Sequence, residues 1–117
     1  MSQPFRVFEI ENQSDLEAAY AVRMRVFVDE QLVPADEELD AYDPVARHFA
    51  VEADGVIVGM ARLVDKDGVG KIGRVAVDLG WRGRGVGLAL MQAAERAATS
   101  AGMTELVLES QTHAIPF

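Results

Sequence analysis

Five segments of the chain have the apolar pattern of β-strands. Alternating apolar and polar residues predict strands at Phe5–Ile10 and Arg47–Ala53, and runs rich in Val, Leu and Ile predict three more at Val56–Val64, Gly70–Val77 and Glu105–Ser110. Val56–Val64 is nearly all apolar, which is typical of a central strand covered on both faces. Asp54-Gly55 is a two-residue hairpin signal, so the strands on either side of it should pair antiparallel.

Two longer segments have the pattern of helices. Ser14-Asp15-Leu16-Glu17 reads as a capping box, and apolar residues follow it at helical spacing until Pro34 ends any continuation. Val86–Ala101 predicts the second helix, with Gly102 as its C-terminal stop. Ala114–Phe117 looks like the first turn of another helix. The order of elements predicts one α/β (α+β) domain over residues 1–117, a mixed and mostly antiparallel sheet flanked by helices.

The amino-acid composition excludes several classes of function for this chain. The chain has 117 residues, a net charge of −8 and no cysteine. Disulfides, thiolate nucleophiles and cysteine metal sites are therefore excluded, and we expect no metal. The acidic balance argues against a nucleic-acid partner. No apolar run is long enough for a membrane helix and no secretory signal is visible, so we expect no membrane partner and a cytoplasmic location.

The acidic residues are concentrated in one segment. Val28–Val45 holds seven Asp and Glu residues and no Lys or Arg. Such a charge run is most simply a solvated loop. It could instead form an electrostatic funnel for a cationic substrate such as an amine. The sequence leaves both interpretations open.

The segment from Val75 to Gly87 carries the chemistry. A predicted strand leads into a loop with glycines at 83, 85 and 87 and then into a helix N-terminus, whose first amides and positive dipole end attract anions. Arg82 and Arg84 add charged donors that suit phosphate oxygens. A Walker A loop needs a lysine after its glycine, and a dinucleotide fingerprint needs Gly or Ala where Leu88 or Leu90 stands, so neither motif fits.

Arg82-Gly83-Arg84-Gly85-Val86-Gly87 resembles the R/Q-x-x-G-x-G/A motif of the GCN5-related N-acetyltransferases (GNAT). Phe27–Pro34, Ala61–Leu63 and Lys71–Val77 are similar to a bacterial branch of small members. The resemblance implies that residues 82–87 bind the pyrophosphate of acetyl-coenzyme A. It also implies that the strand residues Val75, Ala76 and Val77 bind the pantetheine arm, chiefly through the main chain of Val75 and Val77.

The resemblance further implies direct transfer of an acetyl group from acetyl-coenzyme A to an amine of a small molecule or peptide. The amine must lose a proton, and a carboxylate or histidine could accept it. The resemblance also implies a slot for the cofactor between Val75–Val77 and Leu106–Ser110. Glu109 and His113 are the first candidates because both flank this slot, and Glu52 and His48 are weaker ones.

Members of the family have two more C-terminal strands and, often, a tyrosine that protonates or stabilises the leaving thiolate, at a position that would follow Phe117. We therefore expect this chain to be a GNAT domain truncated at its C-terminal end. Two alternatives remain open. The chain could be a module that binds acetyl-coenzyme A without turnover, or a subunit whose open strand edge is completed by a partner, a homodimer being one such assembly.

Overall fold

One five-stranded sheet organises the molecule. The computed structural model describes residues 4–32 and 41–108, and its strands follow one another across the sheet in chain order. The first four pair antiparallel, whereas the last pairs parallel with its neighbour. The strands are β1 (Arg6–Glu9), β2 (Arg47–Ala53), β3 (Val56–Lys66), β4 (Val69–Val77) and β5 (Glu105–Leu108). The mixed α/β fold expected from the sequence is confirmed.

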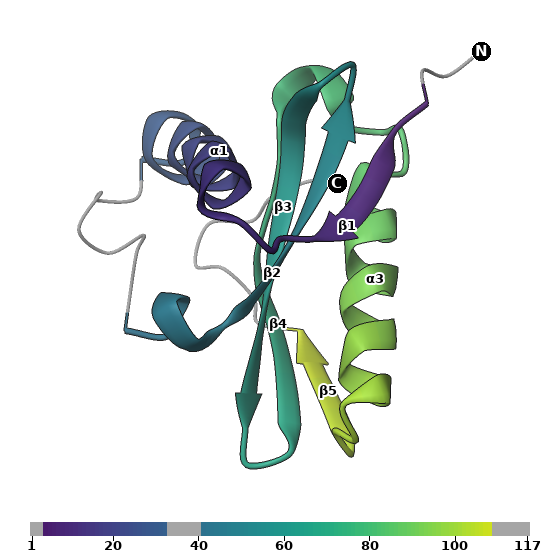
Figure 1. Cartoon of the computed structure of the whole chain (residues 1–117). Coiled ribbons are helices and arrows are strands. Elements are labelled where there is room, and N and C mark those ends of the chain that lie inside the picture. The colour runs from purple at the N-terminus through teal and green to yellow at the C-terminus, as the bar shows by residue number, and fades with distance from the viewer. Residues whose placement is uncertain (1–3, 33–40, 109–117) are drawn as a thin grey trace.

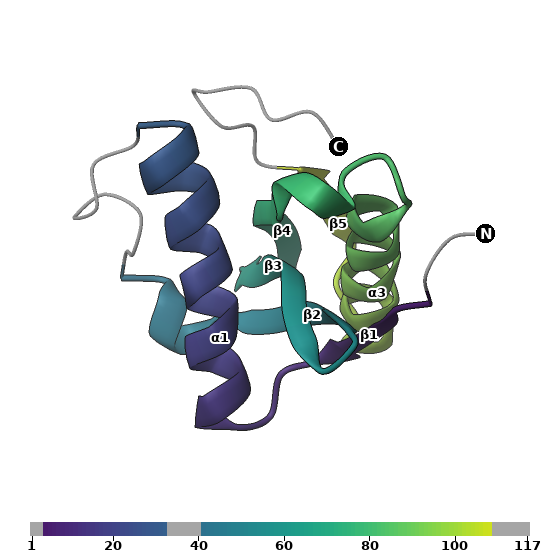
Figure 2. The ribbon, with the colours of Figure 1, turned by 90° about the horizontal axis from the view of Figure 1, so that it is seen from above.

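The two long helices cover opposite faces of the sheet (Figures 1 and 2). α1 (Gln13–Arg23) packs on one face, where Val22 meets Met60 and Ala76 in a buried cluster. α3 (Val86–Ser100) packs on the other face, and its Leu90 belongs to a second and larger cluster. The sheet is therefore buried between two layers of helix, which explains why β3 is apolar along most of its length.

The start of α1 differs from the prediction. Asn12, with extended backbone angles, is the N-cap, and its Oδ1 accepts a hydrogen bond from the Asp15 amide at 2.8 Å. Ser14 lies inside the first turn, so the predicted Ser14 capping box is wrong. Asparagine and serine are about equally good caps. The apolar pattern therefore locates this helix without choosing between cap residues two positions apart.

α1 does not end at Arg23 but continues as the π-helix η1 (Met24–Glu30). The Gln31 amide donates to the Val26 carbonyl at 3.0 Å, which is the five-residue spacing of a π-helix. Val26 and Phe27 bury their side chains on the same face of the sheet as α1. The sequence pattern gave no sign of this change in helical pitch.

The turns of the sheet agree with the sequence. Asp54 and Gly55 both have positive φ, 52° and 77°, as the predicted two-residue hairpin between β2 and β3 requires. Asp67 and Gly68, with φ of 54° and 85°, form an equivalent turn between β3 and β4. These two tight hairpins set the register of the three central strands next to the turns, and each pair shifts its register once further along.

β4 contains a bulge that the sequence did not reveal. On β4, Arg74 and Val75 together lie opposite the single β3 residue Ala61, and Arg74 has a φ of 51°. The extra residue places both Ile72 and Val75 in the buried α3-side cluster, although side chains three apart on a regular strand face opposite ways. The bulge thus lets β4 cover the α3 face on both sides of Arg74.

β5 accompanies only the first half of β4. Its four residues pair with Val69–Ile72, and within the described ranges no strand pairs with Gly73–Val77 on the side away from β3. The side chains of Leu106, Val107 and Leu108 are between 39% and 49% exposed. Among the described residues, the second half of β4 therefore has a main-chain edge without a strand partner, and this edge leads directly to the glycine-rich loop.

Candidate active site

The N-terminus of α3 has no side-chain cap. Gly85 is its N-cap, with a φ of 83°, and no acidic residue lies in the first turn. Ala89 is the first residue whose amide donates within the helix, to the Gly85 carbonyl at 3.0 Å. The amides of Val86, Gly87 and Leu88 consequently have no acceptor within the helix, and the positive end of the helix dipole lies at the same place. An uncapped helix end of this kind is suited to bind an anion, and the binding itself stays a prediction.

The edge of β4 next to this helix end has its main-chain groups turned outward. The Asp78 amide donates to the Val58 carbonyl on β3 at 2.8 Å. Because main-chain groups alternate along a strand, those of Val77 and Val75 face away from β3. They lie on the edge of β4 that Glu105–Leu108 do not pair with, and their role in binding an extended ligand stays a prediction.

Arg82 has protein partners for its whole side chain. Its Nε donates to the Val77 carbonyl at 3.0 Å, and its two terminal nitrogens bond both carboxylate oxygens of Glu30. The side chain is 13% exposed. The Val77 carbonyl is therefore already bonded to Arg82, and the Val77 N–H is the main-chain group of this residue that can face a ligand.

The surroundings of Arg84 differ from those of Arg82. It is exposed, and its guanidinium carbon is 5.0 Å from the centre of the Trp81 ring. Trp81 is partly buried and packs against the α3-side core, so it anchors the loop as an apolar lid. The two arginines that look equivalent in the motif thus have distinct surroundings.

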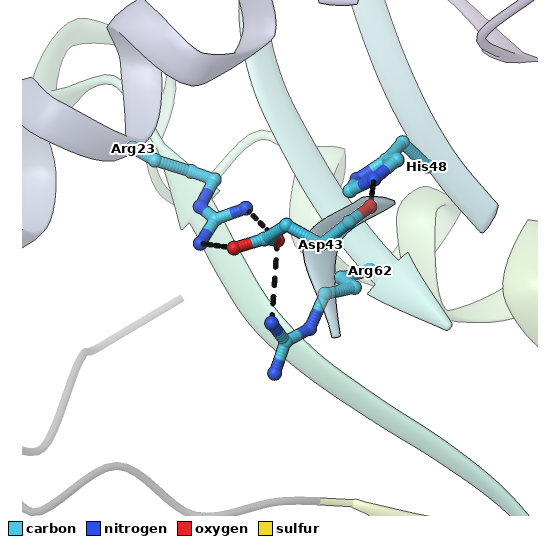
Figure 3. Close-up of polar contacts among 4 residues, drawn as sticks. All are labelled: Arg23, Asp43, His48 and Arg62. Atoms are coloured by element: carbon cyan, nitrogen blue, oxygen red, sulfur yellow. Dashed lines mark hydrogen bonds and ion pairs between the residues drawn. The ribbon is translucent and has the colours of Figure 1, made fainter. Parts of the chain in front are cut away.

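The acidic segment is partly neutralised inside the protein. Asp43 is buried, and its carboxylate bonds Arg23 at 2.6 and 3.3 Å and Arg62 at 3.2 Å (Figure 3). Glu30 is paired with Arg82. Two of the seven acids therefore serve as arginine partners. Four others, at positions 36, 37, 38 and 40, lie outside the described residues.

The candidate bases fall into two groups. Glu109 and His113 lie outside the described residues and stay predictions. His48 is buried, and its Nε2 donates to the Asp43 carbonyl at 3.0 Å. Burial lowers the pKa of His48, so the ring is neutral at pH 7. Glu52 pairs with Arg6 at 3.3 Å. Neither His48 nor Glu52 lies on β4 or β5, where the outward main-chain edge is found.

No cluster of three or more histidine and acidic side chains that could hold a metal ion occurs in residues 4–32 and 41–108. Across the same part of the chain, none of the helices is long and apolar enough to span a membrane.

The comparisons with known proteins decide the family. Residues 13–117 match the Acetyltransferase (GNAT) family. The chain belongs to this family. It is 42% identical over 106 residues to the uncharacterized N-acetyltransferase YjcF of Bacillus subtilis, covering 91% of this chain and 76% of that protein. The GNAT fold, the acetyltransferase class and the resemblance read from the motif are thereby confirmed, and the protein is an N-acyltransferase.

Solved structures agree with this assignment. An acyl-CoA N-acyltransferase from Pseudomonas aeruginosa is 30% identical, with a TM-score of 0.77 over 92% of this chain and 78% of its own. The aminoglycoside N-acetyltransferase AAC(6')-Iy, solved in complex with CoA, is 21% identical and shares the fold with a TM-score of 0.72 over 96% of this chain and 80% of its own.

Some residues of this GNAT site were missed by sequence reasoning. Glu30 was assigned only to the acidic run and to the Phe27–Pro34 resemblance, and Arg25 and Asp78 were not singled out. Arg25 bonds Asp78 at 3.1 and 2.9 Å, and both side chains belong to the boundary between η1 and the loop. The motif arginine Arg82 is the signal that could have pointed to an acidic partner in this region, because a buried charged side chain needs a partner of opposite charge.

Proposed function

We propose that this GNAT protein uses acetyl-coenzyme A as its donor and transfers the acetyl group to an amine of a small molecule or peptide. One observation carries the proposal. The uncapped N-terminus of α3 adjoins the outward-facing main-chain edge of β4, so an anion site and a strand-like binding edge lie end to end. A pyrophosphate followed by an extended pantetheine arm has the same order of groups.

In this proposal the loop residues Gly83–Gly87 hold the pyrophosphate. The amides of Val86 and Gly87 lie at the positive helix end, and Gly83 and Gly85 have φ of 76° and 83°, so the backbone can approach phosphate oxygens without a side chain between them. Exposed Arg84 adds a charged donor beside the loop.

The outward edge at Val75–Val77 would hold the pantetheine arm through hydrogen bonds of the strand type. The bulge at Arg74 comes immediately before this edge and breaks the regular pairing of β4 with β3. An outward N–H near the bulge could then donate to the thioester oxygen and stabilise the negative charge that develops there during attack.

The chemistry is a direct displacement. The neutral amine nitrogen attacks the thioester carbonyl carbon, a carbon–nitrogen bond forms, and the carbon–sulfur bond breaks with its electron pair on sulfur. The proton lost by the nitrogen passes to a base, for which Glu109 and His113 remain the candidates, and the thiolate of coenzyme A takes up a proton on leaving.

The donor site can be tested with a matched pair of glycine variants. Gly85 and Gly102 lie at the two ends of α3, both with positive φ (83° and 81°) and no atom within 4 Å of an added Cβ. Alanine therefore costs each site a similar backbone strain, of about 1–2 kcal/mol. We expect Gly85→Ala to weaken coenzyme A binding measured by calorimetry and Gly102→Ala to leave it unchanged.

The reaction is tested by mass spectrometry of an amine panel incubated with acetyl-coenzyme A. The panel should include small aliphatic amines, amino sugars and peptides with free lysine or N-terminal amines. Acetylation of one of these classes is expected. Tight binding of coenzyme A with no product from any class would favour a binding module instead, and absence of binding would remove both functions.

A further inference from the structure

Two ion pairs tie η1 to the connection between β4 and α3. Arg25 bonds the Asp78 carboxylate through Nε and a terminal nitrogen, and Glu30 bonds the Arg82 guanidinium through both of its oxygens. The two pairs have opposite polarity, since η1 supplies a cation at one end and an anion at the other. The pairing is therefore specific for one alignment of η1 along the loop.

The π-helical pitch of η1 makes this arrangement available. Residues five apart on an α-helix are separated by roughly 140° around the axis, because each residue turns about 100°. Arg25 and Glu30 are five apart, so on an α-helix they would face different directions. In a π-helix residue i bonds residue i+5, and side chains at this spacing lie nearly above one another. Both can then face the β4–α3 connection.

Arg82 receives this contact while holding the end of β4. Its Nε bonds the Val77 carbonyl at 3.0 Å, and its amide bonds the Leu79 carbonyl at 3.4 Å. Glu30 therefore fixes a guanidinium that is itself fixed to β4, three residues before the helix cap Gly85. The loop is held from the α1 layer on one side and from the sheet on the other.

We propose that Glu30 and Arg82 form a positioning pair for the donor site. Glu30 holds the Arg82 side chain in place, and Arg82 sets the path of the loop whose main-chain amides bind the donor's pyrophosphate. This inference rests on the proposed function, and it changes the role that the motif alone gives to Arg82. The guanidinium holds the loop in place and is not itself a phosphate ligand.

The alternative role for Arg82 makes the opposite prediction. If its guanidinium bound phosphate directly, the Glu30 carboxylate would compete with the ligand and repel it. Removing that negative charge would then tighten coenzyme A binding. If the pair holds the loop, the same change loosens it and binding weakens. The sign of one measured change therefore separates the two roles.

The test is the dissociation constant of coenzyme A, measured by calorimetry on the wild type and on Glu30→Gln, Arg82→Lys and the double variant. We expect each single variant to weaken binding about three- to tenfold, the range that a partly buried ion pair can supply. The double variant should bind no more weakly than the weaker single one, because both changes break the same contact. Lysine keeps the charge of Arg82 but cannot reproduce its two-sided contact.

Asp29→Asn is the matched control, because it removes one negative charge from the exposed neighbour of Glu30 and should leave binding unchanged. Tighter or unchanged binding by Glu30→Gln, or losses that add in the double variant, would overturn the positioning role. Urea midpoints show whether each variant is folded. Should Glu30→Gln not fold, an Arg82→Lys variant that binds coenzyme A as tightly as the wild type would still overturn the positioning role. A wild type that binds no coenzyme A would instead overturn the proposed function itself.

Discussion

Gly59 controls how closely α3 approaches the sheet beneath the candidate donor site. It lies on β3 opposite Val77, and a Cβ built on it would be 2.9 Å from Cγ1 of Val86, the first residue of α3. The same Cβ would be 3.3 Å from the Ala76 carbonyl oxygen and 3.3 Å from Cδ1 of Leu90. The substitution Gly59→Ala therefore tests whether this close approach is required.

The cost follows from these distances. Carbon atoms in contact prefer about 3.5–4.0 Å, so Val86 must withdraw by roughly 0.6 Å or more. A helical valine has one strongly preferred rotamer, and the main-chain oxygen of Ala76 cannot move without the strand. Overpacking of this kind costs about 1–3 kcal/mol, whereas replacing glycine within a strand returns about 0.5–1 kcal/mol. We expect a net loss of about 1–2 kcal/mol.

Urea unfolding of Gly59→Ala, Val86→Ala and the double variant measures this loss and assigns it. Val86 is 1% exposed, so Val86→Ala alone should also destabilise the protein, by about 1–2.5 kcal/mol. In the double variant the new methyl group fills space that the valine has vacated, so the total loss should be smaller than the sum by about 1–2 kcal/mol. Strict additivity, or a Gly59→Ala variant at least as stable as the wild type, would refute the steric reasoning.

Three further outcomes are expected. Asp43→Asn should lower the free energy of unfolding by about 3 kcal/mol in urea titrations, because it leaves two buried arginines without their shared carboxylate. Arg74→Gly should be more stable than Arg74→Ala by about 1 kcal/mol, because only glycine adopts the positive φ of this position without strain. At Lys71, which lies on the same strand without a positive φ, Lys71→Ala should instead be more stable than Lys71→Gly. The pKa of His48 is lower in the folded protein than its ordinary value of 6.5, so below pH 6.5 the unfolded chain takes up a proton more readily than the folded one. The free energy of unfolding should therefore fall as the pH drops below 6.5. His48→Asn should flatten that slope.

Two local signals in the sequence predicted the structure correctly, although the local capping signal at Ser14 did not. Asp54-Gly55 specifies a hairpin because both residues tolerate positive φ, and the structure has that turn. The glycines before Val86 mark a strand-to-helix connection with an open helix end, and α3 begins there with Gly85 as an uncapped N-cap. Signals of this kind act within a few residues, so no knowledge of the rest of the fold is needed to interpret them.

Features set by distant contacts were not predictable in this way. The bulge at Arg74 arises because Ile72 and Val75 must both reach the α3-side core, and an arginine there gives no hint of a positive φ. The π-helix after Arg23 keeps Val26 and Phe27 buried while η1 bonds the β4–α3 connection. In both cases contacts between residues distant in the sequence override the local conformational preference of the chain. A pattern of apolar and polar residues along the sequence does not contain those contacts.

The motif arginines show the same limit at the candidate site. Arg82 and Arg84 are one chemical type, two positions apart, beside the same glycines. The fold nevertheless surrounds Arg82 with an acidic partner 52 residues away and a main-chain carbonyl, while Arg84 lies exposed over Trp81. A guanidinium already held by a carboxylate and a carbonyl has few donors left for phosphate. The burial and partners of Arg82, rather than its membership of the motif, therefore argue that it places the loop, and the exposed position of Arg84 supports the contact with the ligand that we propose for that residue.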